Sequence, residues 1–138
     1  MTSRYGITIP FDGVTLSEHR EWFSRLADLG YSDVWSAEVD GADGFTPLIL
    51  AAAWESRLHT GVAVTPVYTR GAGLLAMSVA ALAEVSGGRF TMGLGASSQP
   101  VVERWNGIAY DQPYQRTRDV LRFLKRALDG EKIDEVFE

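Results

Sequence analysis

Apolar residues along this chain follow two alternating spacings, one typical of strands and one typical of helices. Short runs rich in β-branched and aromatic residues predict strands, and longer stretches with apolar residues three or four positions apart predict helices. The elements predicted in this way are strands at 5–9, 31–37, 58–64 and 90–92, and helices at 15–29, 46–54, 74–85, 101–105 and 113–128. Four units of a strand followed by a helix therefore follow one another along the chain.

Residues with capping and turn chemistry separate these elements. Thr15 and Glu18 have the spacing of a capping box at a helix start. Gly30 is placed to end the first predicted helix, and Pro47 suits the first turn of the second. The last segment, 131–138, is acidic, and we interpret it as a tail or as a linker to a further part of the protein.

The alternation of strands and helices predicts an α/β fold in which helices cover a parallel sheet. Two architectures satisfy this pattern. One is an open, doubly wound sheet, and the other is the first half of an eight-stranded barrel. Both have the same periodicity, so the pattern alone leaves both open.

Composition narrows the class of protein. With 138 residues, of which 46% are hydrophobic, the chain is a packed globular domain or part of one. The formal net charge of -5 argues against nucleic acid and anionic membranes as partners. Cysteine is absent, which excludes disulfides and thiol chemistry. The N-terminus lacks the layout of a signal peptide and no apolar run approaches the ~18 residues of a membrane span, so we expect a cytoplasmic protein.

A glycine-rich segment, residues 93–98, follows the fourth predicted strand and reads Gly-Leu-Gly-Ala-Ser-Ser. Glycines at a strand end let backbone N–H groups approach a ligand, and a helix start attracts negative charge. The G-x-G-x-x-S spacing is similar to a dinucleotide fingerprint but lacks its third glycine and its later acidic residue. The segment indicates a ligand loop, although a capped turn before a helix explains it equally well.

Several motifs occur together in the order in which one protein family has them. They are Trp35-Ser-Ala-Glu38 with Phe45-Thr-Pro-Leu48, Thr60-Gly-Val-Ala-Val-Thr-Pro66 with Tyr68-Thr-Arg70, Ser86-Gly-Gly-Arg-Phe90 leading into 93–98, and Arg104-Trp-Asn-Gly107 with Pro113-Tyr-x-Arg116. With these motifs the chain resembles the bacterial luciferase-like family, in its branch that depends on the deazaflavin coenzyme F420. Members are barrels of eight βα units and about twice this length. The resemblance therefore implies that residues 1–130 form the N-terminal, coenzyme-binding half of a TIM-type (β/α)8 barrel.

The resemblance implies an oxidoreductase that transfers a hydride between coenzyme F420 and a small organic substrate. The alternative within the family is a monooxygenase that depends on FMN. A third hypothesis is a half-barrel without catalysis that only assembles or binds flavin, because the chain is short for a family member. The first two hypotheses place the coenzyme at the carboxyl ends of the strands.

The resemblance also implies which residues form the site. Glu38, at the end of the second predicted strand, is the catalytic candidate, as a hydrogen-bond partner or proton carrier; the alternative is a solvated carboxylate. The resemblance further implies that the peptide bond between Ala63 and Val64 is cis and that this bond, with Thr65, would lie behind the coenzyme ring. The alternative is an ordinary trans bond. The ribityl or phosphate part of the coenzyme would contact the loop residues Gly95, Ala96, Ser97 and Ser98.

The remaining candidates receive structural interpretations. Family members often have a histidine after the acidic residue, but here that position is Val39. We interpret His19 and His59 as structural and expect no metal site. The predicted helices at 46–54 and 74–85 are apolar nearly all round, so we expect burial on more than one face. The resemblance implies dimer contacts in this region, and we expect a homo-oligomer.

Overall fold

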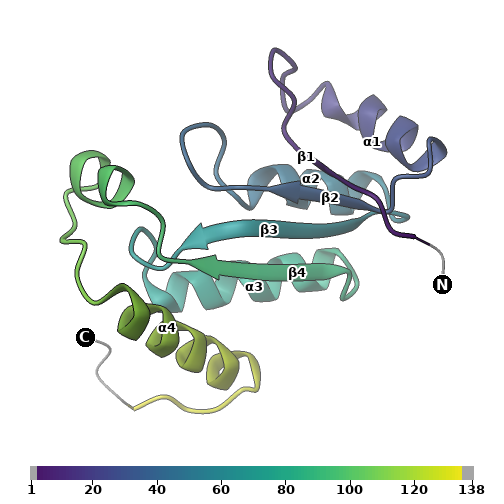
Figure 1. The fold of residues 1–138 in the computed structure, drawn as a ribbon. Coiled ribbons are helices and arrows are strands. Elements are labelled where there is room, and N and C mark those ends of the chain that lie inside the picture. The colour runs from purple at the N-terminus through teal and green to yellow at the C-terminus, as the bar shows by residue number, and fades with distance from the viewer. Residues whose placement is uncertain (1–2, 135–138) are drawn as a thin grey trace. The chain divides into compact units, whose positions relative to one another are not determined.

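The computed structural model describes residues 3–134 and is an α/β protein (Figure 1). Its four strands form one sheet in the order β1-β2-β3-β4. The strands are β1 (Gly6–Thr8), β2 (Asp33–Ser36), β3 (His59–Pro66) and β4 (Phe90–Gly95). The helices are α1 (His19–Asp28), α2 (Thr46–Trp54), α3 (Ala72–Val85), the π-helix η1 (Pro100–Trp105) and α4 (Pro113–Leu128). β1 pairs in parallel with β2, and β2 with β3. The order of elements agrees with the prediction.

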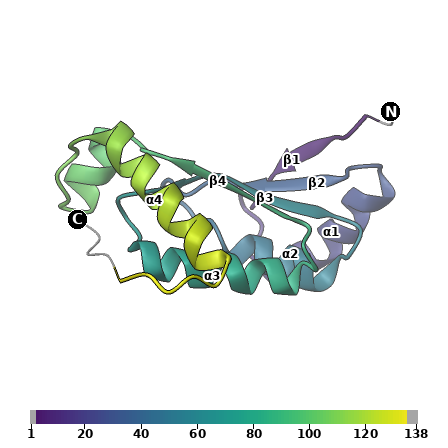
Figure 2. The same cartoon turned by 90° about the horizontal axis from the view of Figure 1, so that it is seen from below.

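The chain divides into two compact units. The first contains the chain up to Thr65 together with Ala81–Gly93, and the second contains Pro66–Ala80 together with the chain from Leu94 onward. The core of the first unit lies between the strands and the helices α1 and α2, which Figure 2 shows on the same face of β1, β2 and β3.

Side chains of this core come from every neighbouring element. α1 contributes Phe23 and Leu26, which are three positions apart and therefore share one helix face. α2 contributes Leu48, while β2 and β3 contribute Val34 and Val62, all three without exposed surface. Burying a side chain of this size stabilises a fold by about 1.5–3 kcal/mol.

Trp35 covers the opposite face of the sheet in the first unit. Successive strand residues point to opposite faces, so the Trp35 side chain points away from that of Val34. A Cβ atom at Gly61 would lie 2.4 Å from Cζ3 of the Trp35 ring, and one at Gly6 would lie 2.9 Å from its Cδ1. Glycines on β1 and β3 therefore provide the room that the indole occupies.

The second unit is organised around α4 and two tyrosines whose rings are in contact. α4 buries Val120 and Leu124, one helical turn apart. The rings of Tyr68 and Tyr110 lie 5.2 Å apart, and the guanidinium of Arg116 lies 5.0 Å from the centre of the Tyr68 ring. These contacts connect the segment after β3 with α4 and with the loop before it.

The end of the fourth strand differs from the prediction. β4 continues to Gly95, whereas the sequence pattern ended the strand at Met92. A Cβ atom at Gly93 would lie 2.2 Å from the carbonyl oxygen of Val62 on β3. Glycine is thus needed here for close approach of two strands, and it does not mark a strand end.

The start of the first helix also differs. α1 begins at His19, whereas the capping box predicted a start at Thr15. Glu18 does reach back to the main-chain N–H of Thr15, at 2.8 Å, and the Thr15 hydroxyl donates to the same carboxylate at 2.6 Å. These bonds close a turn ahead of the helix. Other boundaries move by one or two residues.

In the single chain, α2 and α3 are not buried all round. Leu48 on α2 and Leu75 and Leu82 on α3 are fully buried, but Ile49 on α2 and Leu74, Met77 and Val85 on α3 are exposed. One chain covers one side of each helix, so self-association stays a prediction. Within residues 3–134 no helix has the length and composition needed to cross a membrane.

Candidate functional site

The ends of β2 and β3 bring predicted site residues together in the first unit. Glu38 lies two positions beyond the end of β2. Its main-chain N–H donates to the carbonyl of Val64 on β3, at 3.3 Å. Glu38 is therefore adjacent to the segment Ala63–Thr65, as predicted for a site at the carboxyl ends of parallel strands.

The Glu38 side chain holds the loop between β2 and α2. Its Oε2 accepts a hydrogen bond from the main-chain N–H of Gly44 at 3.0 Å, and the Ser36 hydroxyl donates to the Gly44 carbonyl at 2.6 Å. A Cβ atom at Gly44 would lie 3.2 Å from that same Oε2 and 3.1 Å from Val62. Both sides of the Gly44 backbone are thus fixed, and the half-buried carboxylate is oriented at the strand ends.

Two consecutive exposed residues, Ala63 and Val64, are followed by a buried one, Thr65. Ala63 is exposed and Val64 is 38% exposed, directly after the buried Val62. The peptide bond between Ala63 and Val64 is cis, as predicted. Thr65 is fully buried, and its hydroxyl has no hydrogen-bond partner in the described part of the chain. Buried hydroxyls in proteins nearly always have a partner, so this one is an exception.

In the second unit, the predicted loop residues follow β4 and lead into η1. The Gly95 carbonyl accepts a hydrogen bond from the main-chain N–H of Val67 at 2.9 Å. The Ser98 carbonyl accepts one from the N–H of Val102 at 3.0 Å, which closes the first turn of η1. Gly95, Ala96 and Ser97 are half-buried, and Ser98 is exposed.

Ser97 adopts a backbone conformation that is uncommon for a residue with a side chain. Its φ angle is 62°, in the left-handed region. The hydroxyl of Tyr110 donates to the Ser97 carbonyl at 3.3 Å and holds this turn from the loop before α4. Left-handed conformations cost roughly 1–2 kcal/mol, and such strain concentrates at ligand sites.

Tyr110 is a residue that the sequence analysis missed. Its ring packs at a tilt against that of Tyr68, whose hydroxyl donates to the Asp111 carbonyl. Burial, with Tyr110 and Asp111 nearby, raises the pKa of Tyr68, so this phenol remains a hydrogen-bond donor at neutral pH. Tyr68 and Arg116 belong to the motifs quoted above, but no spacing in the sequence connects Tyr110 with Ser97.

The two histidines lie on different elements, His19 on α1 and His59 on β3. His19 has the structural role predicted for it. It is 1% exposed. Its Nε2 accepts from the N–H of Phe11 at 2.8 Å, and its Nδ1 lies 2.8 Å from the Thr15 carbonyl. His59 begins β3, at the opposite end of the strand from Val64. Among the described residues, no three His, Asp or Glu side chains gather into a group that could hold a metal ion.

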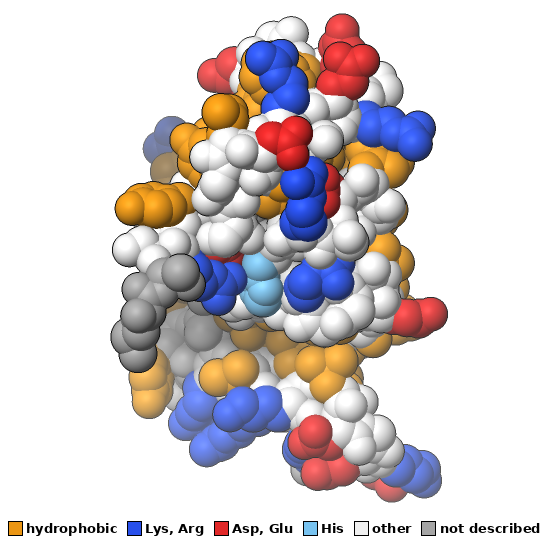
Figure 3. Space-filling view, turned by 90° about the vertical axis from the view of Figure 1, so that its right-hand side faces the viewer, with side chains coloured by type: hydrophobic (Ala, Val, Ile, Leu, Met, Phe, Trp, Pro, Cys, Tyr) orange, Lys and Arg blue, Asp and Glu red, His pale blue; other side chains and the backbone are white. Residues whose placement is uncertain are grey.

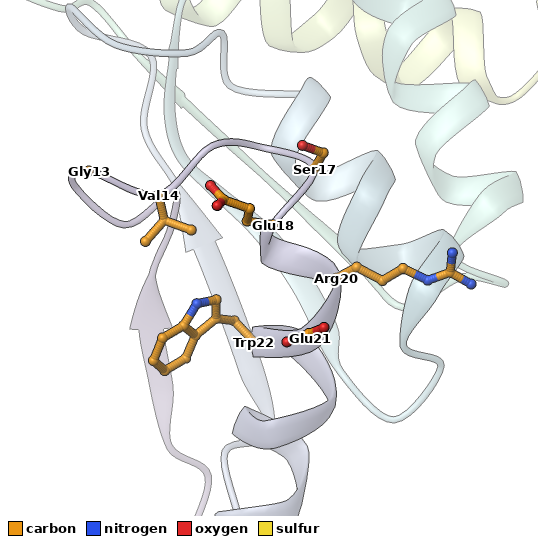
Figure 4. Close-up of a pocket in the computed structure, with 7 residues that line it drawn as sticks. All are labelled: Gly13, Val14, Ser17, Glu18, Arg20, Glu21 and Trp22. Carbon is orange, nitrogen blue, oxygen red and sulfur yellow. The ribbon is translucent and has the colours of Figure 1, made fainter.

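A pocket lies where the loop after β1 meets α1 (Figure 4). Its volume is about 560 Å³. In Figure 4, Val14 and Trp22 lie on one side of the helix start, and Arg20 extends away from them. None of the predicted site residues lines this pocket. The lining residues are Gly13, Val14, Ser17, Glu18, Arg20, Glu21 and Trp22.

Comparison with known proteins shows which family this chain belongs to. The model of a family described as luciferase-like monooxygenase matches residues 3–136. The chain is 32% identical over 127 residues to 5,10-methylenetetrahydromethanopterin reductase of Methanolobus tindarius, across 91% of this chain and 38% of that protein. It spans about a third of the length of the curated relatives it matches.

Two solved structures share its fold. The coenzyme F420-dependent tetrahydromethanopterin reductase of Methanopyrus kandleri matches 92% of this chain and 40% of its own, with a TM-score of 0.76 and 23% identity. The oxygenating constituent of 3,6-diketocamphane monooxygenase of Pseudomonas putida, in complex with FMN, matches 100% of this chain and 42% of its own, with a TM-score of 0.84 and 14% identity. The predicted fold class, parallel βα units of a TIM-type barrel, is confirmed.

Proposed function

Because the chain belongs to the luciferase-like monooxygenase family, we propose that it is the coenzyme-binding part of an oxidoreductase, within residues 1–130. The coenzyme is F420, and the enzyme transfers a hydride between it and a small organic substrate. The observation that carries this proposal is the exposed Ala63–Val64 segment at the end of β3, with Glu38 hydrogen-bonded beside it. We also propose that the enzyme is located in the cytoplasm.

The first unit suits the planar ring of such a coenzyme. Ala63 and Val64 offer apolar surface that a flat heterocycle covers, which removes both the ring face and the strand end from water. Thr65 adds a buried hydroxyl without a partner in the described chain.

The second unit suits the polar part of the coenzyme. The turn at Ser97 and Ser98 supplies two hydroxyls, and Gly95 and Ala96 leave main chain without bulky side chains before them. Hydroxyls and main-chain N–H groups are the common donors to phosphate and sugar oxygens. We therefore assign these four residues to the ribityl or phosphate part.

The coenzyme supplies the hydride chemistry when bound, and the protein supplies position and proton handling. Ala63 and Val64 support one face of the ring and exclude water from it. Glu38 holds the loop before α2 through Gly44, and its carboxylate serves the substrate as a hydrogen-bond acceptor or proton carrier. Proton transfer by a positioned carboxylate contributes about 10²–10⁴-fold to a rate.

FMN is the alternative coenzyme, and one observation favours it. The camphane monooxygenase that has the higher TM-score of the two structures above is in complex with FMN. Against this, the reductase from Methanolobus tindarius is 32% identical to this chain, and the solved reductase from Methanopyrus kandleri, which shares the fold of this chain, is F420-dependent. Sequence identity reflects ligand contacts more closely than fold does, so we place F420 first.

Titration of the purified protein with F420 and with FMN, followed by coenzyme fluorescence, tests the proposal. We expect saturable F420 binding and FMN binding that is at least about tenfold weaker. Tight FMN binding without F420 binding would replace the oxidoreductase with the monooxygenase. Binding of neither coenzyme would favour the third hypothesis, a half-barrel that only assembles.

A further inference from the structure

A cluster of charged side chains at the opposite end of the sheet takes no part in the proposed function. Arg4 precedes β1, Asp33 and His59 are the first residues of β2 and β3, and Arg89 directly precedes β4. All four belong to the first unit. The parallel register pairs Asp33 with His59. Figure 3 views the molecule from the side where β3 and β4 begin and shows a histidine with cationic side chains on both sides.

Asp33 is fully engaged within this cluster. Arg4 donates to both of its oxygens, through Nε at 3.1 Å and through Nη2. The Ser32 hydroxyl donates to the same carboxylate. The Asp33 side chain is 6% exposed, whereas that of Arg4 is 62% exposed. Both oxygens of the Asp33 carboxylate thus have hydrogen-bond partners, while the Arg4 side chain remains largely exposed.

Arg89 brings a second guanidinium without a second carboxylate. Its Nε donates to the Leu58 carbonyl at 3.4 Å, which is its hydrogen-bond acceptor within the described chain. Its main-chain carbonyl accepts from the N–H of Thr60 at 2.8 Å and fixes its position beside β3. His59 lies between the two arginines, and its Nε2 is 2.9 Å from the hydroxyl of Thr91.

The charges of the cluster do not balance. Burial, and then Arg4 and Arg89, lower the pKa of His59, and Asp33 offsets this only in part. The imidazole is therefore neutral at pH 7, which leaves two guanidinium groups and one carboxylate. A group of donors with an excess positive charge attracts anions, and a guanidinium fork matches the geometry of an oxyanion.

We propose that Arg4, His59 and Arg89 form a binding site for a small oxyanion of the class of phosphate or a phosphate monoester. The guanidinium of Arg89 and the exposed side of Arg4 donate to the anion, and Thr91 donates through its hydroxyl. His59 joins them in its protonated form. His59 and Val64 are five residues apart on β3, about 16 Å at ~3.3 Å per residue, so the site does not overlap the proposed coenzyme site.

Proton NMR of the histidine ring C–H groups tests this site with inorganic phosphate as the probe. An anion beside His59 stabilises the imidazolium, so phosphate raises the pKa of His59 by about one unit or more. His19 is the internal control, because it is buried and hydrogen-bonded elsewhere, and its resonances stay unchanged. Sodium chloride at matched ionic strength separates specific binding from screening.

Two variants complete the experiment. Arg89→Gln keeps a donor for the Leu58 carbonyl and removes the charge, so we expect phosphate affinity to fall about tenfold or more. Arg122→Gln on α4 is the matched control and retains wild-type affinity. An equal response to chloride, an unchanged response in Arg89→Gln, or no response of His59 to phosphate would each overturn the proposal. None of these readouts depends on F420 binding.

Discussion

The main-chain N–H of Glu38 donates to the carbonyl of Val64 at 3.3 Å, which ties the residue after β2 to the end of β3. The bond places a carboxylate-bearing residue beside an exposed apolar segment, because parallel strands end at the same edge of a sheet. A flat ring can lie on this apolar surface, and the fixed carboxylate beside it can transfer a proton. The proposed redox chemistry depends on this pair.

Replacing Val64 with Asp removes the apolar surface proposed to support the ring. A charged side chain there keeps water at the strand end, so we expect F420 affinity to fall by at least about tenfold. Leu29→Asp, directly after α1 in the same unit, is the matched control, since Leu29 is 75% exposed and lies outside the proposed site. Fluorescence titration measures both variants. Equal affinities would contradict the assignment of Val64.

Glu38→Gln separates the charge of this residue from its hydrogen bond. The amide oxygen of glutamine still accepts from the Gly44 N–H, so we expect Tm and coenzyme affinity to stay near wild type. Turnover falls by about 10²-fold or more, because glutamine carries no proton. Steady-state kinetics and a thermal melt measure the two effects.

Glu38→Ala is the companion variant and also loses the bond to Gly44. It lowers Tm because the loop before α2 is no longer held. A glutamine variant with full turnover would show that Glu38 acts only through the loop.

Gly61 is required by the indole of Trp35. A methyl group at Gly61 overlaps the ring, so Gly61→Ala destabilises the fold by about 1–3 kcal/mol. Gly73→Ala is the control, because a Cβ atom at Gly73 in α3 meets nothing within 4 Å. That change stabilises the helix by about 0.5–1 kcal/mol. Urea unfolding measures both, and equal effects at the two positions would refute the packing of Trp35 described above.

The pair Glu55 and Arg57 makes stability depend on pH. Arg57 donates to both carboxylate oxygens, at 2.9 and 2.7 Å, and these bonds lower the pKa of the Glu55 carboxyl despite its burial. A carboxylate with a lowered folded-state pKa stabilises the fold above its ordinary value of 4.5. That stabilisation is lost as the pH falls through the folded-state value. Glu55→Gln therefore lowers Tm by a few degrees at pH 7, and this difference shrinks as the pH falls through the folded-state pKa of Glu55, below 4.5. A difference that stays constant over this range would contradict the account.

Self-association through α3 is the prediction that the exposed apolar residues carry. Met77 is 65% exposed on a helix that is apolar nearly all round. We expect sedimentation to show a homo-oligomer and Met77→Asp to weaken it, because an oligomer buries this side chain against a partner. Tyr114→Asp, at a 79% exposed position on α4, leaves the oligomer intact. A monomeric wild-type protein would remove the prediction.

Periodicity and turn chemistry predicted the elements and their order correctly, because the spacing of apolar residues along the chain reflects which side of each element faces the core. The two errors have different causes. Gly93 resembles a strand terminator, yet it serves the close approach to Val62. Thr15 and Glu18 form their predicted bonds, but these close a turn instead of starting the helix.

Only those residues of the site that belong to family motifs could be predicted from the sequence. Resemblance placed Glu38 and the Ala63–Val64 bond at the ends of their strands; Glu38 lies two positions beyond β2, and the Ala63–Val64 bond lies two residues before the end of β3. The contact of Tyr110 with Ser97 joins residues separated by a helix and a loop, so no local spacing reports it. The oxyanion cluster gathers residues from the starts of four strands, and only the sheet register reveals it.

Amide chemical shifts of the 15N-labelled protein, recorded while F420 is added, test the central claim most directly. We predict that the largest changes fall on Glu38, Val64 and Thr65. Changes confined to the pocket of Figure 4, or no changes at saturating coenzyme, would contradict the claim.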